Sequence, residues 1–285
     1  MLGVLGDEWT LLIIQRALLG AKRYSEFASA LPVSNSVLTS RLQSMVAADL
    51  LTRREYQRNP SRSDYPATAK SRSLWPMLTS IWEWERRWVP GQAHRLPGMR
   101  HTACGSDFAP LVTCKACGVV TSEKDVVAQW GPSGSWERSV PSTTNRRRSV
   151  KRRGDAGLLF PQTMSVLGDR WAFALLVAAF VGAERFTDFQ FQLSAPPGTI
   201  ADRLSVFGAE GILVNTAGRY RLTEKGRAFF PVLVTALEWA QRWYPDLEGP
   251  AVRLAHAACD GQFNPVLTCD QCATALSRSQ VIPVG

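Results

Sequence analysis

The feature that most constrains the fold of this 285-residue chain is an internal repeat. Residues 4–9 recur almost unchanged as residues 166–171, and residues 23–27 recur as residues 185–189, both 162 positions later. From residue 65 onward the offset between matching residues is 155, so one loop is longer in the first copy. A repeat of this kind is the signature of a duplicated structural unit. We therefore expect two copies of one fold, which the chain length also favours.

The first copy has the pattern of a short series of helices and strands. The spacing of apolar residues predicts helices over residues 9–19, 25–31, 35–48 and 70–88. Residues 50–56 and 65–68 are predicted strands, and an arginine-containing loop joins them. Three helices, a hairpin and a closing helix predict a winged helix-turn-helix, so the expected fold class is mainly α, of the α+β type.

The third predicted helix carries small polar side chains on the side expected to face solvent. Ser34 can cap this helix, while Val37, Leu38, Leu42, Met45 and Val46 are expected to face inward. Hydroxyl, amide and guanidinium groups reach base edges and phosphates without bulk, and the loop arginines can contact the DNA backbone. The candidate DNA-binding residues are Ser34, Asn35, Ser36, Thr39, Ser40, Arg41, Gln43, Arg58 and Arg62 in the first copy, with Thr199 and Arg203 in the second.

Several motifs in both copies resemble the HxlR-type family of bacterial transcriptional regulators. They include Leu-Gly-Asp-x-Trp before an apolar helix, Arg-Tyr-Ser-Glu-Phe, Leu-Thr-Ser-Arg-Leu and a tryptophan-rich final helix. The resemblance covers about residues 1–90 and 160–245. It implies a DNA-binding regulator, usually a homodimer of single-domain chains. Because this chain is a tandem, either its two copies pair as a pseudo-dimer or two chains form a homodimer.

The second copy is less suited to DNA than the first. Its third helix begins with Pro196, Pro197 and Gly198 and carries Asp202, and its short wing, residues 215–219, has one arginine. We expect a transcriptional regulator, a repressor, that reads duplex DNA mainly through the first winged helix. The second copy would be a pseudo-dimer partner or would hold a small-molecule or redox effector. DNA binding by both copies alike, and a protein–protein adaptor, are the alternatives.

The overall charge favours an anionic partner. Lys and Arg number 33 against 24 Asp and Glu, a net charge of +9, and the excess lies before residue 161. No apolar run reaches the ~18–20 residues of a membrane span, and no basic segment of a secretory signal begins the chain, so we expect a cytoplasmic protein that does not bind membranes. The phosphate-cradling and nucleophile motifs of common enzymes are also missing, so we do not expect an enzyme.

The segment between the copies, residues 121–158, is rich in Ser, Gly, Pro and Arg and lacks apolar periodicity. It predicts a flexible basic linker, and its arginine-rich residues 145–153 either solubilise the chain or contact phosphates. The predicted domains are a winged helix at 1–94, a knuckle with one histidine and three cysteines at 95–120, the linker at 121–158, a second winged helix at 159–249 and a second knuckle at 250–278.

All six cysteines and two of the three histidines fall into two identical patterns, His-x2-Cys-x9-Cys-x2-Cys. The two patterns are His101, Cys104, Cys114 and Cys117, and His256, Cys259, Cys269 and Cys272. Two short pairs separated by a loop can bring four ligands to one tetrahedral point. We expect each pattern to form a zinc-ribbon-like element around one structural zinc. A degenerate or differently metallated site, or disulfides, are the alternatives.

Tryptophans are concentrated in the closing helix of each copy. They are Trp75, Trp82, Trp84 and Trp88 in the first copy and Trp239 and Trp243 in the second. Packing in the core and between the copies accounts for such residues. The alternative is an aromatic-lined effector pocket between the copies.

Overall fold

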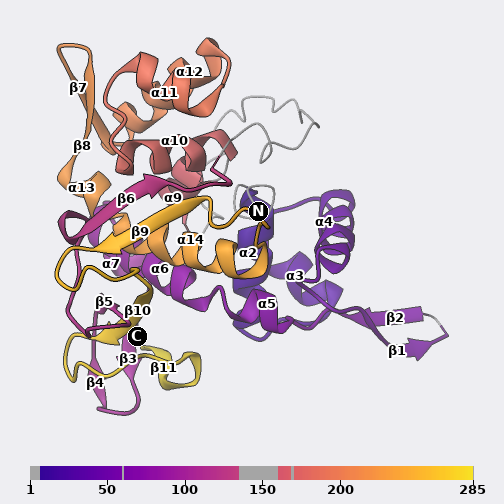
Figure 1. Cartoon of the computed structure of the whole chain (residues 1–285). Coiled ribbons are helices and arrows are strands. Elements are labelled where there is room, and N and C mark those ends of the chain that lie inside the picture. The colour runs from indigo at the N-terminus through magenta and orange to yellow at the C-terminus, as the bar shows by residue number, and fades with distance from the viewer. Residues whose placement is uncertain (1–6, 60, 135–159, 168–169, 285) are drawn as a thin grey trace.

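The computed structural model describes residues 7–59, 61–134, 160–167 and 170–284 (Figure 1). The helices of the first copy are α2 (Glu8–Leu18), α3 (Tyr24–Ala30), α4 (Asn35–Ala47), α5 (Ala69–Arg72), α6 (Trp75–Trp88) and α7 (Gln92–Arg95). Its strands are β1 (Arg54–Arg58), β2 (Ser61–Asp64), β3 (Gly98–His101), β4 (Ser106–Asp107), β5 (Pro110–Cys114) and β6 (Val126–Trp130). The arginine-rich residues 145–153 lie outside the described residues.

The second copy repeats most of this order of elements, without counterparts of α7 and β4. Its helices are α9 (Pro161–Leu167), α10 (Arg170–Phe180), α11 (Phe186–Leu193), α12 (Pro197–Ala209), α13 (Glu224–Arg227) and α14 (Phe230–Trp243). Its strands are β7 (Leu213–Thr216), β8 (Arg219–Leu222), β9 (Val252–His256), β10 (Pro265–Cys269) and β11 (Val281–Val284). Within the described ranges, every helix is too short or too polar to cross a bilayer.

Side-chain caps set the starts of the first three helices. The Asp7 carboxylate accepts a hydrogen bond from the Thr10 N–H at 2.9 Å and begins α2. Glu26 accepts from the N–H groups of Lys22 and Arg23 at the start of α3, and the Ser34 hydroxyl accepts from the Val37 N–H at 3.4 Å at the start of α4. These caps satisfy N–H groups that have no partner within a helix. All three helices lie within about a residue of their predicted bounds.

Three expectations for the first copy are wrong in detail. The long closing helix is broken into α5 and α6, because Pro76 has no N–H to continue a helix but fits its first turn. The predicted wing loop is mostly the hairpin β1–β2, with Arg58 paired to Ser61. The predicted strand at residues 50–56 overlaps β1 only at residues 54–56, and the predicted strand at residues 65–68 lies after β2 instead of forming it. Periodicity locates these strands poorly, because an exposed ribbon has no apolar alternation. Leu38 is buried as predicted, but Val37 is 37% exposed.

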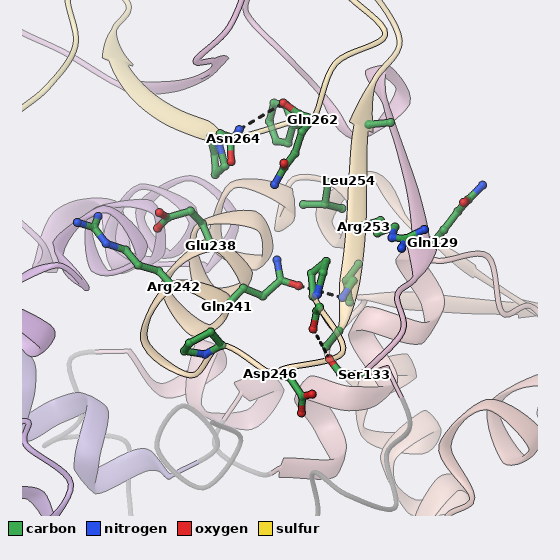
Figure 2. Close-up of a pocket in the computed structure, with 18 of the residues that line it drawn as sticks. Gln129, Ser133, Glu238, Gln241, Arg242, Asp246, Arg253, Leu254, Gln262 and Asn264 are labelled. Atoms are coloured by element: carbon green, nitrogen blue, oxygen red, sulfur yellow. Dashed lines mark hydrogen bonds between the residues drawn. The ribbon is translucent and has the colours of Figure 1, made fainter.

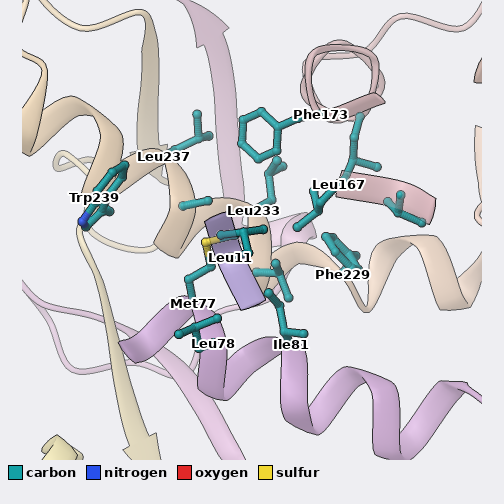
Figure 3. Packing of buried hydrophobic residues seen from close by; sticks show 14 of the residues in the cluster. Leu11, Met77, Leu78, Ile81, Leu167, Phe173, Phe229, Leu233, Leu237 and Trp239 are labelled. Carbon is teal, nitrogen blue, oxygen red and sulfur yellow. The ribbon is translucent and has the colours of Figure 1, made fainter. Parts of the chain in front are cut away.

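The two copies pack together along their closing helices. Helices α6 and α14 lie against each other, and apolar side chains of both copies form one cluster around them (Figure 3). Trp84 donates its indole N–H to the Lys225 carbonyl at 3.1 Å, and Trp239 donates to the Lys70 carbonyl at 2.8 Å. Both partners in these contacts differ by 155 positions, so the same contact is made twice. This reciprocity is the mark of a two-fold interface.

The strands that follow the closing helices also pair between the copies. β5 pairs with β10, β3 with β11, and β6 with β9, all antiparallel. The predicted linker is therefore wrong at its start, since Val126–Trp130 forms β6 on the partner strand β9. In the sequence, β6 is the first-copy equivalent of β11. Each copy thus pairs its last strand, β6 or β11, with a strand of the other copy.

Candidate nucleic-acid interface and metal clusters

The candidate reading helix α4 presents a polar side to solvent. Its predicted contact residues Ser34, Asn35, Ser36, Thr39, Ser40 and Gln43 are all exposed. Arg41 differs from them, because its guanidinium forms an ion pair with the Asp7 carboxylate at 2.8 Å and is half-buried. Arg41 therefore fastens α4 to the start of α2. A contact between Arg41 and DNA would have to share the guanidinium with Asp7.

More basic residues surround the wing of the first copy than the motif analysis singled out. Arg62 is exposed on β2 and Arg58 ends β1. Lys22, Arg23, Arg53 and Arg54 are also exposed on the adjoining loop and strand. Their positions could not be recognised from spacing alone, because the loop before α3 reaches the wing through a backbone bond. The Tyr65 N–H donates to the Lys22 carbonyl at 2.7 Å.

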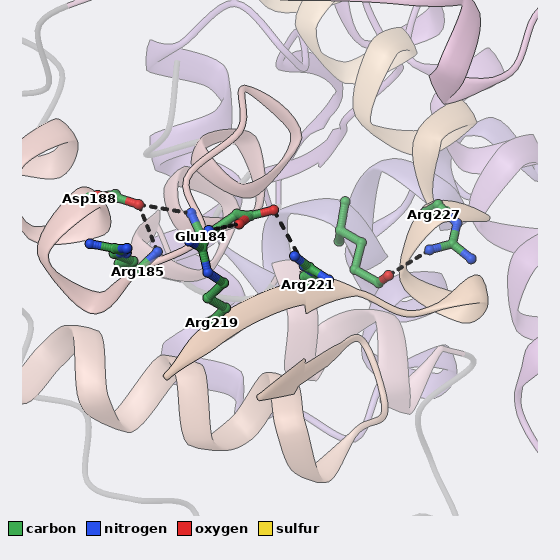
Figure 4. A network of polar contacts seen from close by, with 7 residues as sticks. Glu184, Arg185, Asp188, Arg219, Arg221 and Arg227 are labelled. Atoms are coloured by element: carbon green, nitrogen blue, oxygen red, sulfur yellow. Dashed lines mark hydrogen bonds and ion pairs between the residues drawn. The ribbon is translucent and has the colours of Figure 1, made fainter. Parts of the chain in front are cut away.

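The equivalent position in the second copy carries the opposite charge. There the Tyr220 N–H donates to the Glu184 carbonyl at 2.6 Å, so Glu184 replaces Lys22. The Glu184 carboxylate pairs with Arg219 at 2.8 Å and with Arg221 at 3.5 Å (Figure 4). The hydrogen bond from Arg219 lowers the pKa of Glu184. Both arginines of strand β8 thus share one carboxylate, which offsets one of their two positive charges, whereas Lys22 adds to the positive charge of the first wing.

The two candidates on the second reading helix, α12, are less accessible than those on α4. Thr199 and Arg203 are both half-buried, and Arg203 already has an interaction within the chain. Exposed positions nearby include Pro197, Gly198, Ala201, Asp202 and Ser205. These side chains offer few donors and one negative charge, so α12 is a poorer match to DNA than α4.

The metal-ligand candidates come together, but not in the groups that their spacing predicts. Cluster A consists of His101, Cys104, Cys269 and Cys272, and cluster B consists of Cys114, Cys117, His256 and Cys259. Each cluster takes one ligand pair from each copy, so the expected grouping within a single copy is wrong. The cause is the pairing of β3 with β11 and of β5 with β10, which brings the ligand pairs across.

The dimensions of both clusters fit a tetrahedral ion. In cluster A, His101 Nδ1 lies 3.5 Å from Cys104 Sγ and 3.4 Å from Cys272 Sγ, and the sulfurs of Cys104 and Cys269 are 3.9 Å apart. In cluster B, His256 Nδ1 lies 3.3 Å from Cys117 Sγ and 3.4 Å from Cys259 Sγ. A tetrahedral zinc site has N···S edges of about 3.6 Å and S···S edges of about 3.8 Å. The donor sets therefore match zinc in type and spacing.

Hydrogen bonding prepares one of these thiols for metal binding. The Thr274 hydroxyl, 3.0 Å from Cys272 Sγ, and the Thr274 N–H lower the pKa of Cys272 to about 6. A thiolate is the form of cysteine that binds a metal. The hydrogen bonds from Thr274 thus favour the thiolate form of Cys272, the form that binds an ion.

The two clusters differ in what holds the histidine ring. In cluster B, the Thr121 hydroxyl lies 3.3 Å from His256 Nε2, the nitrogen that points away from the thiols. In cluster A, the equivalent position is the buried Leu276, and His101 Nε2 has no hydrogen-bond partner among the described residues. Partners of this kind fix the orientation of a ligating histidine and raise its basicity. Cluster B therefore has the better-supported histidine.

A large open pocket of about 840 Å³ lies beside α14 and β9 (Figure 2). Several polar groups around it are already paired within the protein. The Val252 N–H donates to Gln241 Oε1 at 2.9 Å, and the Ser133 hydroxyl donates to the Gly249 carbonyl at 2.7 Å. Burial raises the pKa of Glu238 on its wall. These bonds hold β9 against α14, and the segment after β6 against the loop that leads into β9. None of the candidate site residues is among those that line this pocket.

Comparison with known proteins places both copies in one family. The model of the HxlR-like helix-turn-helix matches residues 4–93 and 166–248, together more than half of the chain. Uncharacterized HTH-type transcriptional regulators of Mycobacterium bovis and Mycobacterium tuberculosis are 30% identical over 131 residues, which is 46% of this chain and 83% of each relative. YvaP of Bacillus subtilis, another HTH-type transcriptional regulator, is 33% identical over 87 residues, 30% of this chain and 81% of its own length.

Among solved structures, a transcription factor from Pseudomonas aeruginosa is 30% identical, with a TM-score of 0.37 over 45% of this chain and 88% of that chain. The matched family and the curated relatives are transcriptional regulators rather than enzymes. With a family match in each of its copies, this chain belongs to the HxlR-like helix-turn-helix family.

Proposed function

We propose that this transcriptional regulator is a cytoplasmic repressor that binds duplex DNA mainly through its first copy. The contrast between Lys22 and Glu184 carries the proposal. Lys22 lies beside a wing with exposed arginines, whereas Glu184 pairs with both arginines of the other wing. Phosphate contacts supply most of the sequence-independent affinity for DNA, so the copy whose wing carries more exposed cations binds more tightly.

The exposed side of α4 supports sequence reading by the same copy. Asn35, Thr39, Ser40 and Gln43 present amide and hydroxyl groups to solvent along one helix. Such groups read base edges in the major groove, while the wing arginines fix the register on the backbone. The second copy then serves as the pseudo-dimer partner of the first. Its wing, whose arginines both pair with Glu184, suits contact with another protein better than contact with DNA.

The proposal is tested by fluorescence anisotropy with duplex DNA from the promoter region of the protein's own gene. A scrambled duplex and a salt series run alongside. A specific regulator binds the promoter duplex at least ~1000-fold more tightly than the scramble, and its affinity falls steeply with salt. The measurement is repeated with duplexes that cover the operon and its flanking regions. Equal and weak binding to all of these duplexes and to the scramble would contradict the proposal and favour a protein–protein adaptor.

Removing two arginines from the first wing should weaken DNA binding more than the same change in the second. For Arg58→Ala with Arg62→Ala, we expect a lower affinity for promoter and scramble alike, because phosphate contacts carry little sequence information. The slope of log affinity against log salt should fall by about 2. The matched control is Arg219→Ala with Arg221→Ala, which removes cations already paired to Glu184. Equal losses in the two double variants would show that both copies bind DNA alike.

We also propose that clusters A and B each bind one structural zinc ion. Four protein ligands leave no open position for catalysis, so the ions would stabilise the fold. Each ion would join the first copy to the second, because each cluster contains residues of both. The chain would then act as a pseudo-dimer closed by two metal sites, and oxidation of the thiolates would be the route by which a redox signal reaches it.

The contact between the Thr121 hydroxyl and His256 Nε2 should make cluster B the tighter zinc site. Thr121→Leu gives cluster B the residue that cluster A has at that position, so we expect zinc affinity at cluster B to fall about ten- to a hundredfold. Competition with a chromophoric chelator should resolve a weaker and a tighter site in the wild type and two similar sites in the variant. Thr216→Leu, an exposed change on β7, is the control. An unchanged titration of Thr121→Leu would remove the proposed role of the hydroxyl.

A further inference from the structure

A pocket of about 330 Å³ lies where α2 and α6 of the first copy meet the C-terminal strand β11. Leu18, Trp75, Leu78 and Trp82 form much of its wall, and Ile282 contributes from the second copy. The volume is at the lower end of the range for small-molecule sites, which are mostly apolar with a few placed polar groups. The two indole rings provide flat apolar surface suited to an aromatic ligand.

One side chain in this pocket has unmet hydrogen-bonding capacity. Gln15 lines the pocket on α2 and is only 4% exposed. Both Nε2 and Oε1 of its amide are buried, and neither has a hydrogen-bond partner in the described part of the chain. A buried donor or acceptor without a partner costs about 1–3 kcal/mol. The amide therefore favours a molecule that can both accept from it and donate to it.

The fold itself does not require an amide at this position. In the second copy the equivalent residue is Val177, which is 1% exposed. The equivalents of Leu18 and Trp75 are Phe180 and Phe230, whose ring centroids lie 6.3 Å apart. Aromatic side chains thus pack against one another there, where the first copy keeps a pocket. The difference between two copies of one fold makes Gln15 a feature of the site rather than of the packing.

We propose that this pocket binds a small aromatic carboxamide. The carbonyl of the ligand would accept from Gln15 Nε2, and its N–H would donate to Gln15 Oε1, so that both buried atoms gain a partner. The ring would lie among Trp75, Trp82 and Leu78. Arg278 also lines the pocket, and its guanidinium donates to the Leu18 carbonyl at 2.5 Å, which ties the C-terminal segment to α2.

The test compares two probes of nearly the same shape by isothermal titration calorimetry, without DNA. 2-Naphthamide offers both a carbonyl and an N–H, whereas 2-acetylnaphthalene offers only the carbonyl. Full-length protein should bind 2-naphthamide about tenfold more tightly, the worth of one additional hydrogen bond. In Gln15→Met, which keeps the length of the side chain, the preference for 2-naphthamide should be lost. Because the readout is binding of the probes alone, it does not depend on whether the protein binds DNA.

The stability of the free protein provides a second readout. If the Gln15 amide has no partner, Gln15→Met should raise the melting temperature, because a buried unpaired amide is replaced by an apolar group. Gln190→Met, a half-buried change on α11, should leave the discrimination between the probes intact. Thr79→Phe, which fills the pocket from α6, should abolish binding of both probes. No saturable binding to the wild type, discrimination that survives in Gln15→Met, or a lower melting temperature of Gln15→Met would each overturn the proposal.

Discussion

The Cys104→Ser, Cys272→Ser double variant is expected to bind one zinc ion per chain, and the Cys104→Ser, Cys117→Ser variant none. Cys104 and Cys272 belong to cluster A, so their loss leaves cluster B complete. Cys104 and Cys117 belong to different clusters, so their loss damages both. The two variants remove the same number of thiols, and each serves as the control for the other. Zinc per chain is measured by elemental analysis after dialysis, with the wild type expected to hold two ions.

The same pair of variants distinguishes ligand clusters built from both copies, such as clusters A and B, from ligand clusters built within a single copy. If each copy formed its own site, the stoichiometries would be reversed, with no ion in the Cys104, Cys272 variant and one in the other. Stability should follow the metal content. Apparent binding free energies of structural zinc reach about 10–16 kcal/mol in small domains, so the variant without zinc should melt far below the wild type. Chelation of the wild type should lower its melting temperature in the same way.

The eight candidate metal ligands can be recognised from their spacing, but their grouping cannot. A repeated pattern gives each His-Cys pair two equivalent partners, one in its own copy and one in the other. Spacing along the chain does not distinguish these partners, because both offer two thiolates at the same separation. The choice is made by strands that pair across the copies, notably β5 with β10, whose register sets Val112 opposite Leu267. Such long-range pairing depends on the packing of α6 against α14.

Strand β6 shows how far composition can mislead. Composition alone assigns Val126–Trp130 to the linker, because it adjoins a stretch of Ser, Gly, Pro and Arg. The repeat offset of 155 makes it the equivalent of β11, so the repeat itself contains the signal that a structural element is present. Conversely, the helices before the wing can be predicted well, because caps such as Asp7 and Ser34 act over three residues. Local chemistry can be deduced from the sequence, and contacts between the copies cannot.

Replacing Trp239 by alanine is expected to destabilise the protein by about 3–5 kcal/mol, the usual loss for a fully buried aromatic side chain. Trp239 is 1% exposed, donates to the Lys70 carbonyl and lies 5.7 Å from the Tyr244 ring. The Lys70 ammonium in turn lies 4.0 Å from the centroid of that ring. The side chain thus joins the core of the second copy to α5 of the first. Denaturant unfolding followed by circular dichroism measures the loss.

Two further variants divide this loss of stability into its causes. One separates the packing of Trp239 from its hydrogen bond, and the other controls for the removal of any indole. Trp239→Phe keeps a ring but loses the donor to Lys70, so a smaller loss of about 1 kcal/mol is expected. Trp88→Ala removes a half-buried tryptophan at the end of α6 and should cost less than Trp239→Ala.

The shape of the unfolding transition tests the role of Trp239 at the interface. If Trp239 joins the copies, Trp239→Ala should also separate their transitions, since the interface is what makes the two winged helices unfold together. A loss no larger than that of Trp88→Ala, with a single sharp transition, would mean that the metal clusters and the crossed strands hold the copies together without this contact.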